Sequence, residues 1–340
     1  MDMCAIDART RVSLRSRALR VACLSLLTIG VAVVGSLVLG DFGVPLPGVM
    51  QAFLRDDGTD AAFVVRELRL PRLLTGMLVG AALGLAGAVV QAVTRNPLGE
   101  PGLLGVTAGA AFAMALCMTY FSLPTTSELA VGTFGGIVAA MLTLAIGMSA
   151  RLDPMHLTLT GMSVNLFFAA AIVVMLVCAN VEVNGIYYWL TGSLINRTWE
   201  HVAVLWPWTA AGLLLGLVFA EKLDALILDE DILASLGVRV TAWRLLFGIV
   251  VVLLAAAAVA AAGPITFIGL VAPHIVRFAL GTQGVRYRLL LPLSALVGAC
   301  LVCTADLAAK WQEVPVGVLC VLLGGPVLVC LIGKQEVADA

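Results

Sequence analysis

The sequence predicts an all-α integral membrane protein with about ten transmembrane helices, arranged as two halves of five. Of the 340 residues, 61% are hydrophobic and only 12% are charged, whereas soluble domains have about 25% charged residues. The mean hydropathy is +1.07. Uncharged stretches near the roughly 20 residues that a spanning helix needs recur along the chain, without the alternation typical of barrel strands.

The spans follow from the positions of the charged residues. The interval between Arg244 and Arg277 is too long for one span and is interrupted by "AGPITF", where Gly263 and Pro264 predict a turn, so we divide it into two. The first apolar run is interpreted as a span and not as a signal peptide, because no A-x-A-like cleavage site follows it. The expected spans are 19–40, 70–93, 103–121, 129–150, 157–180, 202–220, 242–262, 266–281, 289–309 and 315–333.

The basic residues predict the orientation. Five arginines precede the first span, which by the positive-inside rule keeps the N-terminus in the cytoplasm, and ten spans return the C-terminus there. On this topology 14 of the 20 Lys and Arg residues lie inside. The six external ones are Arg55, Arg66, Arg69, Arg72, Arg197 and Lys310. By themselves, the arginines of "VVRELRLPRLL" (64–74) suit either interfacial snorkelling or bidentate binding of an external carboxylate.

We expect one compact domain. Residues 1–20 form a basic cytoplasmic segment, residues 21–335 form the ten-span domain with a cytoplasmic loop at 221–244, and residues 336–340 form a cytoplasmic tail. Two halves of opposite orientation would be typical of inverted repeats in transporters. A weak sequence similarity between "NPLGEPGLLGV" (96–106) and "GPITFIGLVAP" (263–273) agrees with such a repeat.

Three segments depart from plain apolar helix. In the cytoplasmic loop, Asp229 and Gly237 can begin and end a short helix, although an ordinary solvated connector is the alternative. His274 and Arg277 stand near the inner end of a span, where they suit an interfacial anchor or a bond to freed carbonyls better than a proton relay. The third segment, "RNPLGEPGLLG" (95–105), breaks the backbone between two spans, which requires shielding by protein or a water-filled cavity.

With these segments, the chain resembles the permease subunits of ABC importers for iron-siderophores, haem and cobalamin, the FecCD-type family. The matching stretches follow the family order and cover nearly everything after residue 66. They are "RLPRLLTGMLVGAALGLAGAVVQAVTRNPLGEPGLLGVTAGA" (69–110), "LTLTGMSVN" (157–165), "YWLTGSL" (188–194), "LDEDILASLGV" (228–238), "GPITFIGLVAPHIVR" (263–277), "RLLLPLSALVGACLVCTADLAAK" (288–310) and "EVPVGVLCVLLGGPV" (313–327). The combination is far more specific than any single glycine motif.

The resemblance implies the fold of a type II ABC importer permease and a set of partners. These partners are a cytoplasmic ABC ATPase dimer, a second permease subunit in a homo- or heterodimer, a periplasmic substrate-binding protein and membrane lipid, with no nucleic acid. Because the partner ATPase hydrolyses ATP, this subunit is not expected to be an enzyme. It implies no catalytic residue, no cofactor and no metal site.

The resemblance also implies three groups of site residues. The residues implied to dock the binding protein are Arg69 and Arg72 of "RLPR", together with Lys310. At the position of Lys310, four residues after Asp306, the family has an arginine. Lysine keeps the positive charge but lacks the planar guanidinium of arginine. The translocation gate falls to Asn96, Leu98, Asp153, Pro154 and Met155. ATPase coupling falls to Leu228, Asp229, Glu230, Asp231, Ala234, Leu236 and Gly237.

The expected function is transport of an iron chelate, a ferric siderophore, from a periplasmic binding protein across the inner membrane. "YWLTGSLINRTW" (188–199) resembles the ferric-siderophore members more than the cobalamin members, while haem and cobalamin stay open. An ion-coupled secondary transporter is disfavoured because the span centres are nearly bare of charged ligands. An intramembrane enzyme is disfavoured because the sequence has three histidines and neither H-E-x-x-H nor G-x-S-x-G.

Overall fold

The computed structural model describes residues 2–40, 42–54, 58–121, 123–149, 154–179, 184–228, 233, 239–281, 285–312 and 314–339. Every regular element within these ranges is a helix. In the described part of the chain, seven helices are long and apolar enough to cross a membrane, and three shorter apolar helices accompany them. The ten correspond to the predicted spans, so the all-α membrane fold is confirmed. They are α1 (Asp2–Val38), α4 (Leu70–Val93), α5 (Val106–Tyr120), α6 (Thr125–Ser149), α7 (Pro154–Ala179), α9 (Trp199–Val218), α12 (Val240–Ala262), α13 (Ile268–Leu280), α14 (Tyr287–Gln312) and α15 (Val316–Asp339).

The structure adds short elements that the sequence analysis treats as loops. They are α2 (Leu46–Leu54), α3 (Asp60–Phe63), the π-helical η1 (Val64–Arg69), the 3₁₀-helical η2 (Pro101–Leu104), α8 (Asn184–Leu190) and α10 (Ala220–Leu226). The described part of the connection between the first two predicted spans is therefore largely helical, and η1 runs directly into α4. At the chain ends, α1 begins well before the predicted first span and α15 continues past the predicted last one, because no residue in either extension interrupts a helix.

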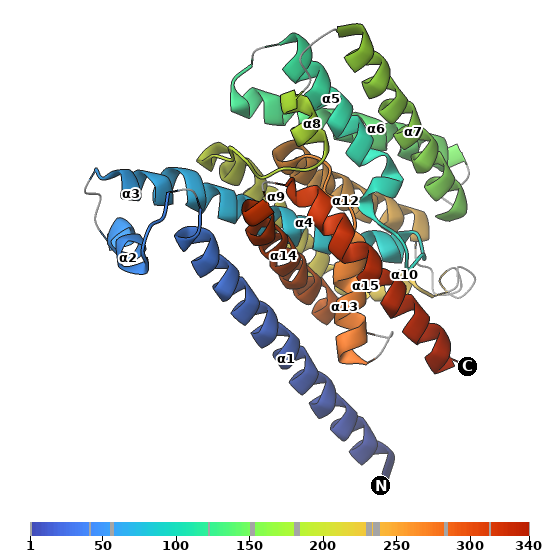
Figure 1. Ribbon diagram of the computed structural model, residues 1–340. Helices are drawn as coiled ribbons and strands as arrows, with labels where there is room; N and C mark the ends of the chain where they lie inside the picture. Colours follow the sequence, from blue (N-terminus) through green and yellow to red (C-terminus); the bar gives the residue numbers. More distant parts are fainter. Residues whose placement is uncertain are drawn as a thin grey trace.

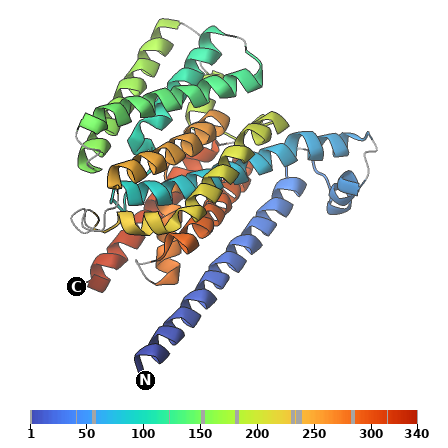
Figure 2. The same cartoon turned by 180° about the vertical axis from the view of Figure 1, so that it is seen from behind.

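The short helices α2 and α3 and the chain termini lie at opposite ends of the bundle. Helices α2 and α3 lie at one end of the bundle, and both chain termini lie toward the other (Figure 1). The view from behind shows the same arrangement, with α1 slanting along the outside of the bundle (Figure 2). Both termini therefore share a side, as an even number of crossings requires.

Helix α4 lies at the centre of the fold. It packs against α14, α12, α13 and α9, all of which come from the second half of the chain. The contact is close because glycines face one another: a Cβ atom on Gly80 would lie 2.3 Å from the carbonyl oxygen of Gly298, and one on Gly84 would lie 2.2 Å from that of Ser294. Such small-residue contacts let membrane helices approach. The two halves of the sequence therefore interleave, and do not fold as separate five-helix bundles.

Two irregular segments meet inside the bundle. The chain turns after α12 at Gly263, whose φ is 72°, as the sequence predicts, and α13 begins after Phe267, whose φ is 70°. Beside it, Gly269 packs so tightly that a Cβ atom there would lie 2.7 Å from Cδ of Pro101. The two similar segments of the sequence, 96–106 and 263–273, are therefore in contact, and the surrounding protein shields their irregular backbone.

The glycine contact between α4 and α14 gives a stability prediction. Gly80→Ala places a methyl group against the Gly298 carbonyl, so we expect it to lower the free energy of unfolding by about 1–3 kcal/mol. The matched control is Gly30→Ala in α1, where a Cβ atom meets nothing within 4 Å. That change should leave stability equal or slightly higher, because alanine favours helix. Thermal unfolding in detergent compares the two, and equal midpoints would contradict the close packing.

Candidate functional site

Arg69, at the junction of η1 and α4, is buried against the end of α1. Its Nη1 donates hydrogen bonds to the carbonyls of Leu37, at 2.5 Å, and Val38, at 3.3 Å, and its Nη2 donates to the carbonyl of Phe42. The Leu37 and Val38 carbonyls lie at the C-terminal end of α1, where the helix leaves acceptors unsatisfied and favours a positive charge, and Phe42 follows that helix. Only 7% of Arg69 is exposed. The guanidinium thus caps α1, a structural role that the sequence analysis does not assign.

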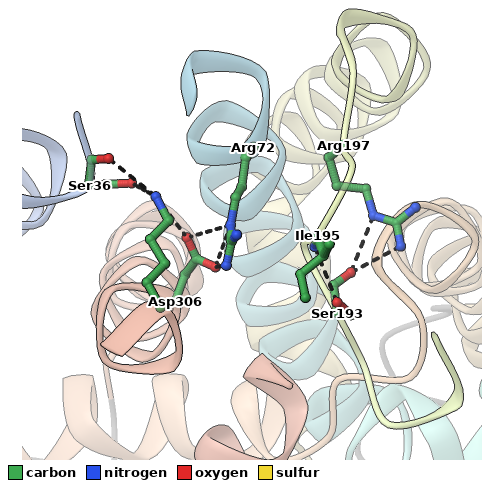
Figure 3. Close-up of polar contacts among 7 residues, drawn as sticks. Ser36, Arg72, Ser193, Ile195, Arg197 and Asp306 are labelled. Atoms are coloured by element: carbon green, nitrogen blue, oxygen red, sulfur yellow. Dashed lines mark hydrogen bonds and ion pairs between the residues drawn. The ribbon is translucent and has the colours of Figure 1, made fainter. Parts of the chain in front are cut away.

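Arg72 forms an ion pair with Asp306 of α14. The Nη2 atom of Arg72 lies 2.7 Å from Oδ1 of Asp306, and Nε donates to the same oxygen at 3.0 Å (Figure 3). The Asp306 side chain is 4% exposed and that of Arg72 is 19% exposed. Burial of a carboxylate is costly unless an opposite charge pairs with it. Arg72 therefore joins α4 to α14 while part of its side chain stays accessible.

Lys310, one turn after Asp306, completes this cluster. Its Nζ lies 3.9 Å from Oδ2 of Asp306 and donates hydrogen bonds to the carbonyl oxygen of Ser36, at 3.2 Å, and to its hydroxyl. Helices α1, α4 and α14 are thereby fastened together at one end. The structure brings the three predicted docking residues, Arg69, Arg72 and Lys310, to this end, and each also makes internal contacts.

Arg197 is a fourth cation at the same end, which the sequence analysis counts as external without giving it a role. Its Nε and Nη2 donate to the Ser193 carbonyl at 3.2 and 3.1 Å (Figure 3). Its Nη1 lies 3.1 Å from Nε2 of His201. Burial, and secondarily the charge of Arg72, lowers the pKa of Arg197 to about 10. Arg197 therefore stays charged at neutral pH.

These four cations line one cleft, which we call the outer cleft. Its volume is about 800 Å³. Among the described residues of its lining, Glu67 is the acidic one, so positive side chains outnumber negative ones there. The lining is formed by Leu39, Gly40, Phe42, Val64, Glu67, Leu68, Arg69, Arg72, Tyr188, Ile195, Asn196, Arg197, Thr198, Ala309, Lys310 and Val314. Guanidinium groups in such a recess attract and bind carboxylates.

At the other end of α4, a second cavity, which we call the inner cavity, contains part of the predicted gate. It has a volume of about 370 Å³ and is lined by Thr94, Arg95, Asn96, Met155, Thr158 and Leu159. The structure thus brings Asn96 and Met155 together. The Asn96 side chain accepts a hydrogen bond from the Leu98 backbone N–H at 2.9 Å, whereas the Leu98 side chain is exposed and outside the lining.

The remaining predicted residues are only partly described. Pro154 begins α7, and Asp153 lies outside the described residues. Leu228 is exposed just after α10. The coupling residues Asp229, Glu230, Asp231, Ala234, Leu236 and Gly237 also lie outside the described residues.

Helix α13 carries polar residues beside the C-terminal end of α4. The Nη1 atom of Arg277 donates to Oε1 of Gln91 at 2.6 Å, and Nε2 of Gln91 donates to the carbonyls of Gly99, at 3.4 Å, and Leu270, at 3.5 Å. Nδ1 of His274 lies 2.9 Å from the Leu270 carbonyl. His274 therefore contacts a backbone carbonyl, one of the two roles expected for it, whereas Arg277 contacts the Gln91 side chain.

Arg69 also yields a stability prediction. Arg69→Gln removes the hydrogen bonds to the end of α1, so we expect the free energy of unfolding to fall by about 2–3 kcal/mol. Arg288→Gln is the control, since it breaks an ion pair with Glu221 in which both side chains are mostly exposed; it should cost about 1 kcal/mol or less. Thermal unfolding of both variants checks the difference. An Arg69→Gln variant with the wild-type thermal midpoint would show that this cap is dispensable.

Comparison with known proteins agrees with this architecture. The model of the FecCD transport family matches residues 26–334. The Fe(3+) dicitrate transport system permease protein FecD of Escherichia coli is 36% identical over 94% of this chain and 100% of its own length. The iron(3+)-hydroxamate import system permease protein FhuB of Bacillus subtilis is 36% identical over 93% of this chain and 83% of its own length.

A solved structure shares the fold. It shows a candidate metal-chelate type ABC transporter in an inward-facing conformation, and it aligns with a TM-score of 0.81 and 28% identity over 93% of this chain and 99% of that one. The resemblance drawn from the sequence motifs is therefore confirmed. The match over nearly the whole length, in sequence and in fold, places this chain in the FecCD transport family.

Proposed function

We propose that this chain is the permease subunit of an ATP-driven importer that moves an iron chelate, a ferric siderophore, across the inner membrane. The observation that carries the proposal is the family match over residues 26–334, together with relatives whose names specify iron(3+) chelates. The ten apolar helices support a multi-pass membrane location. On this proposal the N- and C-termini are cytoplasmic, and residues 21–335 act as one permease domain.

The proposed partners follow from the two ends of α4. The outer cleft faces the periplasm, where carboxylates of a substrate-binding protein meet Arg72, Lys310 and Arg197, while Arg69 chiefly holds the wall of the cleft. The segment that begins at Leu228 faces the cytoplasm and meets an ABC ATPase. A second permease subunit completes the pathway, and ATP hydrolysis belongs to the partner, so this chain is not itself an enzyme.

Reconstitution tests the proposal. Proteoliposomes that contain the permease, its ATPase and its binding protein should accumulate ⁵⁵Fe-siderophore only when ATP is supplied on the ATPase side. Haem and cobalamin serve as competing cargoes, and uptake of either in place of the siderophore would redirect the proposal within the family. Uptake driven by a proton or sodium gradient without ATP would instead favour a secondary transporter and overturn it.

A further inference from the structure

Helix α2, in the connection between the first two spans, has an exposed apolar face. Its side chains Leu46, Met50, Phe53 and Leu54 are between 49% and 81% exposed. Residues three, four, seven or eight positions apart lie on the same side of a helix, so these four form one continuous surface, which we call the α2 stripe. Exposed apolar surfaces of this kind mark sites of interaction with a partner or a membrane.

The opposite side of α2 holds the helix in place. Val49 and Ala52 are buried in a small apolar cluster whose other members are Leu37, Val44, Ala62 and Val65. Arg66 of η1 caps the end of α2, since its Nε donates a hydrogen bond to the Ala52 carbonyl at 2.5 Å and its Nη2 donates to the Phe53 carbonyl at 3.5 Å. Rotation of α2 would expose Val49 and Ala52, so the α2 stripe stays on the surface.

The position of α2 places this stripe beside a spanning helix. Helix α2 lies next to the C-terminal end of α1 and outside the bundle, and it packs against α3, η1 and α1 (Figure 1). The view from behind shows the same separation from the other spans (Figure 2). Along α1, the side chains of Leu27, Val31 and Val34 are exposed, as expected for a helix in contact with lipid. Exposed apolar side chains therefore accompany α1 up to the point where α2 lies beside it.

Exposed tryptophans mark the same end of two other spans. Trp199 is the first residue of α9, and Trp311 lies at the end of α14; they are 40% and 82% exposed. Their neighbours in sequence, Thr198 and Lys310, line the outer cleft, as do Phe42 before α2 and residues of η1 after it. Tryptophan is enriched where membrane spans meet the aqueous phase. Helix α2 is therefore connected to the end of the bundle at which a membrane surface is expected.

The chemistry of the α2 stripe distinguishes between possible partners. The nine residues of α2, "LPGVMQAFL", include no charged side chain. The outer cleft beside it is instead lined by Arg69, Arg72, Arg197 and Lys310. A protein that docks through carboxylates would bind these cations and would gain little from an uncharged apolar surface. Lipid acyl chains match the stripe, and amphipathic helices bury such a face at the boundary between headgroups and acyl chains.

We propose that α2 is an interfacial helix whose stripe inserts into the outer leaflet of the membrane. Its partner is a lipid surface, bound through apolar contact. Because Arg66 and the buried cluster join α2 to η1, this anchor would hold the rim of the outer cleft at the level of the membrane surface. The inference goes beyond the proposed function, since it requires that the chain spans a membrane and is independent of the cargo.

Fluorescence quenching by lipids tests the proposal. Met50→Cys is labelled with an environment-sensitive nitrobenzoxadiazole dye in a cysteine-free background, and the full importer is reconstituted in phosphatidylcholine vesicles that contain doxyl-labelled phosphatidylcholine. We expect quenching at position 50 to be at least about threefold greater than at position 60, where Asp60→Cys carries the same dye. Asp60, at the start of α3, is also exposed, so exposure alone does not produce this difference.

A pair of double variants tests whether apolar contact is responsible. With the dye at Leu46→Cys, the changes Met50→Glu and Leu54→Glu should lower quenching by lipid at least about twofold, because a carboxylate resists transfer out of water. The matched control, Met50→Leu with Leu54→Met, keeps the stripe apolar and should leave quenching unchanged. All these side chains are exposed, so thermal midpoints in detergent should stay at the wild-type value.

The outcomes separate this inference from the proposed function. Strong quenching at position 50 that is unaffected by saturating binding protein would support the lipid contact. Quenching no greater than at position 60 would overturn it, and so would loss of quenching on addition of the binding protein, which would assign the stripe to that protein. ATP-driven uptake by the same vesicles is measured separately, so either proposal can fail while the other holds.

Discussion

Arg72→Glu should reduce chelate uptake at least about 100-fold, the largest effect that we expect from a single substitution at the outer cleft. A carboxylate at position 72 would face Asp306, whose side chain is 4% exposed, and would also repel the carboxylates of the binding protein. Uptake by the reconstituted importer measures the loss, and titration with the binding protein at low and high salt measures docking. Uptake within twofold of wild type would contradict the role of Arg72.

A charge exchange separates docking from folding. The double variant Arg72→Glu with Asp306→Arg restores an internal ion pair between α4 and α14 but moves the positive charge to α14. If Arg72 serves docking, the thermal midpoint should recover while uptake stays low. If Arg72 is only a structural partner of Asp306, both should recover together. Coupling between the two substitutions is expected because the side chains are in direct contact.

The second large effect concerns the segment proposed to contact the ATPase. Gly237→Pro should lower uptake at least about tenfold while ATP hydrolysis continues, because proline removes an N–H group and cannot adopt the left-handed conformation that commonly ends a helix. Glu230→Arg should act in the same direction, since it reverses the charge in the first turn of the helix that the sequence predicts there. The measurement is the ratio of chelate imported to ATP hydrolysed.

Glu221→Gln is the matched control for this pair. It lies in the first turn of α10, the helix that precedes this segment, and its side chain is mostly exposed. The loss of one exposed ion pair should leave the ratio unchanged. If Gly237→Pro and Glu230→Arg also import at the wild-type ratio, the segment is an ordinary connector, the alternative that its sequence leaves open.

The spans were predictable because each depends on a local property. A stretch of apolar residues between charges identifies a span without knowledge of its neighbours, and the turn at Gly263 follows from glycine and proline in an overlong interval. The short helices α2, α8 and α10 were missed because seven to nine residues give too little periodicity to identify a helix.

The site was only partly predictable because its contacts are not local. Arg69 caps carbonyls about thirty residues away, and Arg72 pairs with Asp306 over a separation of 234 residues. One feature of the sequence could have identified Arg197 as a site residue. It is one of the six basic residues on the external side, where the positive-inside rule predicts few of them. The left-handed backbone of Arg95 has no signal in the sequence, because arginine is not a residue that such a position normally selects.

The central claim is that the outer cleft opens outside the cell while the inner cavity and the end of α10 face the cytoplasm. Labelling of single cysteines in a cysteine-free background tests it most directly. Asp60 is exposed at the start of α3 and Ile227 is exposed just after α10, so each is replaced by cysteine in a separate variant. In intact spheroplasts, a membrane-impermeant maleimide should label position 60 and spare position 227, and inverted vesicles should give the reverse. Labelling of position 227 from outside, with position 60 protected, would contradict the claim.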